Sequence, residues 1–197
     1  DSEAHLDGLL RRAVRDGGNR HWELRGPMLS VLADPAESTL WVSGGDTVLR
    51  ALCAQPAGDP WSLEIHRQPP SPAGRRRATV ESLLWNTAVW SSQGRIPVTM
   101  DPDVAVAVRA WPDLTRCVLT PSVLAVTALL AAGPQRPADV STLLAIPRSH
   151  AFVVLAALDA SGLLEGAAEP AATPPEPPTV HAERGLLRRF LARLRDA

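Results

Sequence analysis

The stretch PRSHAFVVLAALDASGLL, from Pro147 to Leu164, is the feature that most limits how this chain folds. Its centre has helical spacing, yet apolar residues and alanine occupy nearly every position around the helix. A helix that is apolar on all sides is stable only when other parts of a protein surround it. We therefore expect this segment to be a buried strut or a protein contact rather than a helix on a solvated surface.

Two shorter helices are predicted before it. Residues 121–133 start with Pro121 in the first turn and stop at Gly133, and residues 136–146 follow after a short connection. Three helices of these lengths, closed by a Gly-Leu-Leu turn, are typical of a helix-turn-helix or winged-helix module. The apolar segment takes the place of the recognition helix in this module.

A DNA-binding regulator is one function that such a module allows. The polar groups available to it are Arg136, Arg148, Ser149 and His150. Residues 117–165, however, carry two arginines against three carboxylates, a net charge of −1, where phosphate contacts require several positive charges. Leu164 is also expected to run directly into a linker, without a wing hairpin. The pattern favours a protein contact over DNA.

The first half predicts a small mixed domain. Residues 2–16 and 46–54 have the spacing of amphipathic helices. Residues 21–33 and 38–45 read as two strands joined by the turn DPAE, and residues 60–68 alternate as a half-buried strand does. These elements indicate an α+β fold with a small antiparallel sheet.

A proline-rich and then basic segment, PPSPAGRRR at residues 69–77, interrupts the pattern. A longer helix is predicted from Ala78 to Gly94, and a strand over 103–111. Arg75, Arg76 and Arg77 lie just before that helix, and free N–H groups beside guanidinium groups suit an anion such as a nucleotide phosphate. A solvated, mobile loop is the alternative interpretation.

The C-terminal part consists of a Pro/Ala-rich linker, residues 166–183, and a basic amphipathic helix, residues 184–197. Its apolar stripe and two of its arginines are candidate partner-binding residues: Leu187, Phe190, Leu191, Leu194, Arg188 and Arg189. Such a helix can fold back on its own body, dock in a partner's groove or lie on an anionic membrane surface.

No catalytic, metal or cofactor constellation is visible. No two of the five histidines are three or four residues apart, neither cysteine lies in a CxxC motif, and GxSxG is absent. The chain has no lysine to serve a phosphate loop. We expect a non-enzyme without metal or cofactor.

Charge, hydropathy and cysteine usage together predict a cytoplasmic protein. The net charge of −1 gives no overall footprint for nucleic acid, and no apolar run approaches the ~18 residues of a membrane span. The start, DSEAHLDGLL, lacks the pattern of a signal peptide. Cys53 and Cys117 are far apart and flanked by apolar residues, so we expect buried free thiols in a reducing compartment.

Residues 104–164 resemble the winged-helix-like ends of bacterial regulatory proteins, including PatA-type proteins that combine a small sheet domain with such a module. The run RAWPDLTR, residues 109–116, followed by the three helices, also resembles uncharacterised proteobacterial proteins, some of which accompany small Ras-like GTPases in motility or polarity systems. The resemblance covers about a third of the chain, and no motif in it is diagnostic. It implies a protein partner and no catalytic residues.

The sequence thus predicts a small α+β domain (1–100), a helix-turn-helix or winged-helix-like module (101–165), the linker and the terminal helix. The leading hypothesis is a non-catalytic regulatory adaptor whose partner-binding residues also include Arg109, Trp111 and Arg116. The alternatives are a DNA-binding transcriptional regulator and a receptor for an anionic nucleotide, such as a cyclic dinucleotide, at Arg75–Arg77.

Overall fold

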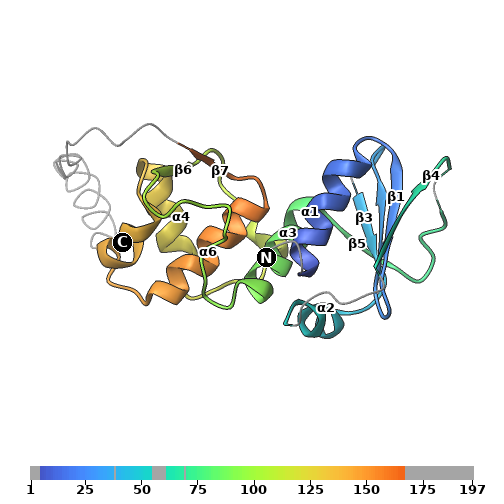
Figure 1. The fold of residues 1–197 in the computed structure, drawn as a ribbon, viewed down its shortest axis with the longest axis horizontal. Helices are drawn as coiled ribbons and strands as arrows, with labels where there is room; N and C mark the ends of the chain where they lie inside the picture. Colours follow the sequence, from blue (N-terminus) through green and yellow to red (C-terminus); the bar gives the residue numbers. More distant parts are fainter. Residues whose placement is uncertain (1–4, 38, 55–60, 69, 167–197) are drawn as a thin grey trace, which may run out of the picture.

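A computed structural model describes residues 5–37, 39–54, 61–68 and 70–166. The fold is mixed α+β, with an antiparallel five-stranded sheet at one end and a group of helices at the other (Figure 1). In chain order the elements are α1 (Leu6–Gly17), β1 (His21–Arg25), β2 (Ser30–Asp34), β3 (Thr39–Val42), α2 (Asp46–Cys53), β4 (Ser62–His66), β5 (Arg76–Ala78), α3 (Val80–Ser92), β6 (Val106–Val108), the 3₁₀ turn η2 (Leu114–Arg116), α4 (Val123–Ala132), α5 (Pro137–Leu143), α6 (Arg148–Ala160) and β7 (Leu164–Gly166).

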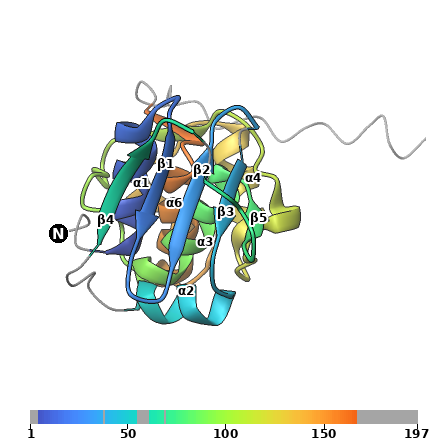
Figure 2. The ribbon, with the colours of Figure 1, turned by 90° about the vertical axis from the view of Figure 1, so that its right-hand side faces the viewer.

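The five-stranded sheet has the order β4-β1-β2-β3-β5, and α1 and α3 lie behind it in Figure 2. The segment 21–33, predicted as one strand, forms the two strands β1 and β2. The backbone N–H of Gly26 donates to the carbonyl of Leu29 at 2.8 Å, and this turn reverses the chain. The predicted DPAE turn is confirmed between β2 and β3, where the Asp34 carboxylate accepts from the N–H of Ala36 at 3.1 Å.

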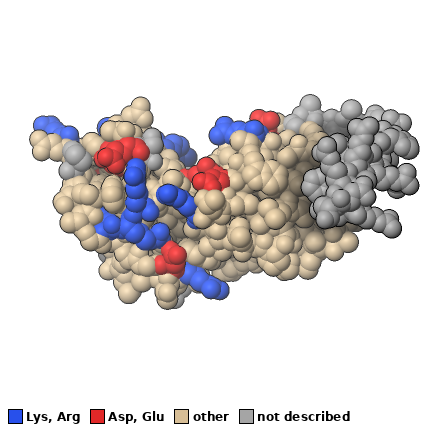
Figure 3. Space-filling model, turned by 180° about the vertical axis from the view of Figure 1, so that it is seen from behind, with Lys and Arg blue, Asp and Glu red and all other residues tan. Residues whose placement is uncertain are grey.

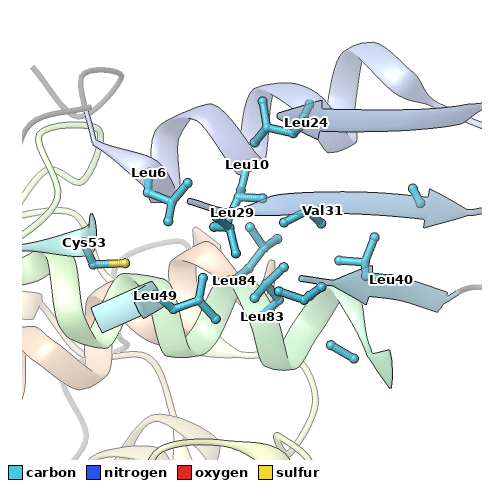
Figure 4. Close-up of a cluster of buried hydrophobic side chains, with 14 of the residues drawn as sticks. Leu6, Leu10, Leu24, Leu29, Val31, Leu40, Leu49, Cys53, Leu83 and Leu84 are labelled. Carbon is cyan, nitrogen blue, oxygen red and sulfur yellow. The ribbon is translucent and has the colours of Figure 1, made fainter. Parts of the chain in front are cut away.

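One face of the sheet, together with α1, α2 and α3, forms the first hydrophobic core. Strand alternation places Leu24, Val31 and Leu40 on the helix-facing side, where they are at most 3 % exposed. Leucines from the three helices meet them there (Figure 4): Leu6, Leu10, Leu49, Leu83 and Leu84. The helices predicted over 2–16, 46–54 and 78–94 are thereby confirmed with small differences at their ends.

Helix α3 belongs to two cores at once. Its start is fixed by Thr79, whose hydroxyl accepts from the N–H of Ser82 in a capping box. Leu83 and Leu84 pack toward the sheet, whereas Trp85, which is fully buried, belongs to a second core built with α4, α5 and α6. The two ends of the molecule are therefore joined through a shared helix.

Helix α6 confirms the expectation from its apolar circumference. It packs against α3, α4 and α5, and eight of its residues are buried, among them Val154, Leu155 and Leu158. Its last residue, Ala160, reaches the first core. The helix is thus a strut between the two halves.

The connection from β4 to β5 crosses the face of the sheet turned away from the helices, as Figure 2 shows, because these strands lie at opposite edges. Pro70, Ser71 and Pro72 line a pocket on that face together with Leu32 and Trp41. Leu32 is only 2 % exposed as a result. The segment interpreted as a break or mobile loop therefore covers the sheet, and its basic end forms strand β5.

Two further differences concern the edges of the fold. Leu164 does not pass directly into the linker, because Leu164–Gly166 pairs with Val106–Val108 as the antiparallel strands β7 and β6. The strand predicted over 103–111 is limited to the three residues of β6. The predicted strand at 60–68 forms β4, but its apolar side chains Leu63 and Ile65 are 37 % and 43 % exposed at the sheet edge.

Candidate functional site

The run from Arg109 to Val118 carries three of the predicted partner-binding residues. Apart from the 3₁₀ turn η2 it belongs to no helix or strand, and it passes along α3. Arg109, Trp111 and Arg116 are all exposed, and 54 % of the Trp111 surface is open to solvent. We name these three residues the Trp111 surface.

The backbone of this run is held in place at both ends. The Arg109 N–H donates to the carbonyl of Leu163 at 3.0 Å. The N–H of Val118 donates to Asn86 Oδ1 at 2.7 Å, and its carbonyl accepts from the indole N–H of Trp85 at 3.0 Å. The Trp111 surface is therefore displayed on an anchored backbone.

The turn itself is capped by Asp113. Its carboxylate accepts from the N–H and the hydroxyl of Thr115 at 3.1 and 2.6 Å. These hydrogen bonds, which outweigh the small effect of burial, lower the pKa of Asp113, and the nearby Arg116 charge acts in the same direction. The carboxylate is the stable form, and it fixes η2, which follows Trp111 and ends with Arg116.

The three arginines of the predicted anion site point to three different places. Arg75 donates to Glu23 Oε1 at 2.6 Å, Arg76 to Asp46 Oδ1 at 2.6 Å, and Arg77 to the Thr39 hydroxyl at 2.9 Å. The structure therefore does not gather them into one cluster. Figure 3 shows that, on the face seen from behind, arginine and acidic side chains gather mainly over the half that holds the sheet.

Two of these arginines and Arg116 are among the residues that line a crevice between β5 and α3. Arg76, Arg77, Ser82, Asn86 and Arg116 line it. The crevice joins a residue of the Trp111 surface to the predicted anion site, a proximity that was not predicted from the sequence. Its polar groups are suited to an anion, although Arg76 and Arg77 already have partners on the sheet half.

Glu23 is the centre of an ion network on the outer face of the sheet. It is 1 % exposed, and its second oxygen accepts from Arg25 at 2.8 Å. Burial raises the pKa of Glu23, but the hydrogen bonds and charges of Arg25 and Arg75 together outweigh it and lower the pKa below 4.5. The carboxylate is held ionised although it lies beneath the strap between β4 and β5.

Glu23, Glu64 and His66 bring three possible metal-ligand atoms within 4.8 Å of one another. They come from two paired strands, which explains why local spacing in the sequence did not reveal them. Both Glu23 oxygens, however, already accept hydrogen bonds from guanidinium groups. A cation would enter beside two positive charges, so the group fits an ion network better than a metal centre.

The polar residues proposed for DNA contact at the start of α6 differ in their surroundings. Arg148 lies over the ring of Phe152, with 4.9 Å between the guanidinium carbon and the ring centroid. Ser149 packs so closely on Gly94 that a Cβ there would lie 2.7 Å from its own Cβ. His150 is half-buried, and Arg136 is at the N-cap of α5.

Both cysteines are free thiols, Cys53 buried and Cys117 half-buried rather than buried. Burial, with smaller contributions from nearby carboxylates, raises the pKa of each to about 12. Both thiols are therefore protonated near neutral pH and are poor nucleophiles.

The candidate residues of the C-terminal helix, Leu187, Phe190, Leu191, Leu194, Arg188 and Arg189, lie outside the described residues. Among the described residues, none of the helices has the length and apolar character needed to cross a membrane.

Comparisons of the chain with protein-family models, with curated proteins and with solved structures find no match.

Proposed function

We propose that this protein is a non-catalytic regulatory adaptor that acts by binding another protein in the cytoplasm. The observation that carries the proposal is Trp111, which is 54 % exposed between two exposed arginines. Tryptophan and arginine are enriched among the residues that contribute most to binding in protein interfaces. An anchored backbone reduces the entropy that is lost when such a surface is bound.

The protonated thiols and the ion-paired Glu23 support the non-catalytic part of the proposal. Active sites usually contain a nucleophile or base whose pKa is shifted toward neutrality in a cleft. In the described part of the chain, the large shifts make both thiols less reactive, and the lowered pKa of Glu23 belongs to a network that holds the strap.

We infer further that α4, α5 and α6, with the β6–β7 pair, form a winged-helix-like module that serves as a protein-binding scaffold. Three helices followed by a strand that pairs back, and the bridge between Val106 and Gln135, support this assignment. The buried α6 supports a scaffold role over a recognition helix. The resemblance of residues 104–164 makes a small Ras-like GTPase the first partner class to test. The predicted C-terminal helix is a second docking element, which binds either the partner or an anionic membrane surface.

Trp111→Ala is expected to weaken partner binding at least about tenfold, because a central tryptophan typically contributes more than 1 kcal/mol to an interface. Folding should change by less than about 0.5 kcal/mol, since the side chain is largely exposed. The measurement is quantitative affinity capture with the full chain, the variant and a truncation ending at Ala168, followed by titration of the purified partner.

Leu124→Ala is the matched control, because Leu124 is 60 % exposed on α4 and is not part of the Trp111 surface. It should capture the partner as the unchanged chain does. Equal binding by Trp111→Ala would remove the Trp111 surface from the proposal, and equal recovery by the truncation would show that the terminal helix is not required for docking.

The crevice lined by Arg76, Arg77 and Arg116 supports a second candidate, a receptor for an anionic nucleotide. Calorimetric titration with a cyclic dinucleotide and with GTP should then give heat, and Arg116→Ala should weaken binding about tenfold through loss of a charge-assisted contact. Arg12→Ala, at an exposed position on α1, is the control. Absence of heat with both nucleotides would reject this candidate.

A further inference from the structure

A second crevice lies at the waist of the molecule, where the start of α1 meets the end of α3 and the middle of α6 (Figure 1). His5, Asp7 and Arg11 line it from the α1 side, and Ser91 from α3. The turn after α3 adds Arg95 and the apolar residues Ile96, Pro97 and Val98. This crevice at the waist is separate from the Trp111 surface and from the arginine crevice beside β5.

Several residues that line this crevice also carry buried polar atoms without a hydrogen bond of ordinary geometry. The buried atoms His5 Nδ1, Arg11 Nε and Ser91 Oγ make no hydrogen bond of ordinary geometry within the described ranges, and Ser91 as a whole is only 8 % exposed. The Ser91 hydroxyl has one weak partner inside the protein, the Cys53 thiol, and their hydrogen bond opposes the rise of the Cys53 pKa that burial causes. Buried polar groups in native proteins are nearly always satisfied by protein, water or a bound molecule.

The Asp7 carboxylate adds a buried negative charge. Asp7 is 7 % exposed, and no ion pair or hydrogen bond joins its carboxylate to another described residue. A carboxylate removed from water requires a positive or hydrogen-bond-donating partner to offset its desolvation. The side of the crevice that carries Asp7 is therefore suited to bind a cationic group.

Arg11, in contrast, is suited to bind an anionic group. Its Nη1 donates to Asp159 of α6 at 2.7 Å, which holds the guanidinium in place and leaves Nε–H without an acceptor. Arg95 brings a second guanidinium to the rim. A simple anion would be repelled by Asp7, and a simple cation by the two arginines, whereas a molecule carrying both charges satisfies both walls.

We propose that this crevice binds a free α-amino acid with an apolar side chain. The ammonium group pairs with Asp7, the carboxylate pairs with the guanidinium groups of Arg11 and Arg95, and the side chain lies against Ile96, Pro97 and Val98. Because α1 packs on the sheet while α3 and α6 extend into the second core, one small ligand contacts both halves of the protein. The proposal is independent of the adaptor function.

Calorimetry and thermal unfolding of the full chain with each standard L-amino acid test this site. An apolar amino acid such as L-leucine is expected to bind with one-to-one stoichiometry and to raise the unfolding temperature. Leucinamide, which lacks the carboxylate, and 4-methylpentanoate, which lacks the ammonium group, should each bind at least about tenfold more weakly.

Asp7→Asn and Arg95→Ala should each weaken leucine binding, the first at least about tenfold. Asp16→Asn is the matched control, because Asp16 lies at the exposed end of the same helix. Circular dichroism shows whether each variant is folded, and Asp7→Asn should fold at least as stably as the unchanged chain without ligand, because it removes an unpaired buried charge. The site is rejected by the absence of heat with every amino acid, by equal binding of leucinamide, or by unchanged binding in folded Asp7→Asn.

Discussion

Trp85→Ala is expected to lower the free energy of unfolding by about 3–5 kcal/mol, the range for truncating a buried tryptophan. Trp85 is fully buried in the second core, and its indole N–H donates to the Val118 carbonyl at 3.0 Å. The substitution opens a cavity between α3 and α6 and also releases one anchor of the Trp111 surface. Urea unfolding followed by circular dichroism measures the loss.

Trp85→Phe separates packing from hydrogen bonding. It keeps most of the ring but leaves the Val118 carbonyl unpaired, so a smaller loss of about 1–3 kcal/mol is expected. Trp111→Ala is the matched exposed control and should stay within about 0.5 kcal/mol of the unchanged chain. If Trp85→Ala were as stable as Trp111→Ala, Trp85 would not join α3 to the second core as described.

Glu23→Gln is expected to lower the free energy of unfolding by about 3–5 kcal/mol at neutral pH, because removing one partner of a buried ion pair leaves an uncompensated charge. Arg75, whose side chain is 15 % exposed, loses its charged partner, and the strap over the sheet loses its attachment. Glu64→Gln is the control. Its side chain is 43 % exposed, so the change should cost less than about 1 kcal/mol.

The effect of Glu23 should depend on pH. Since the pKa of Glu23 in the folded protein lies below its ordinary 4.5, the carboxylate contributes fully to stability above that value. The contribution is lost as the pH falls through the lower folded-state pKa. The stability difference between the unchanged chain and Glu23→Gln should therefore shrink below about pH 4.5, as urea unfolding at a series of pH values would show. A difference that grew over that range would contradict the assigned direction.

The helices of this fold were predictable because their signals are local. The apolar spacing around Leu6 and Leu10 and the stop signal at Gly94 place α1 and α3 within a few residues of their observed ends. The apolar circumference of α6 predicted its burial correctly, since only a surrounded helix tolerates such a sequence.

The errors lie where distant residues decide the outcome. Arg76–Ala78 has little strand propensity of its own and forms β5 because β3 offers it a paired edge. Leu63 and Ile65 alternate as buried strand residues do, yet β4 is an edge strand, and they remain partly exposed. The split of 21–33 into two strands had a local signal, Gly26-Pro27, which was not read as a turn.

The same difference between local signals and contacts of distant residues applies to the predicted sites. Trp111 and Arg116 are exposed, and their partner-binding role stays a prediction. The backbone after them is anchored at Val118 by Asn86 and Trp85, which lie about 30 positions away in the sequence. The three arginines at 75–77 were treated as one feature, although alternation along a strand turns neighbouring side chains to opposite faces. Nothing in the sequence connects Asp7 with Ser91, because only the packing of α1 on α3 brings them to one crevice.

Helix α3 also limits how this protein can change in evolution. Leu83 and Leu84 complete one core and Trp85 the other, so the helix cannot be assigned to either half. A gene fragment that begins after residue 100 would encode the second core without Trp85. A fragment that ends at residue 100 would contain Trp85 but not the helices that bury its indole ring. Exchange of either half between proteins would therefore require α3 to be duplicated or rebuilt, and we expect the two halves to be inherited together.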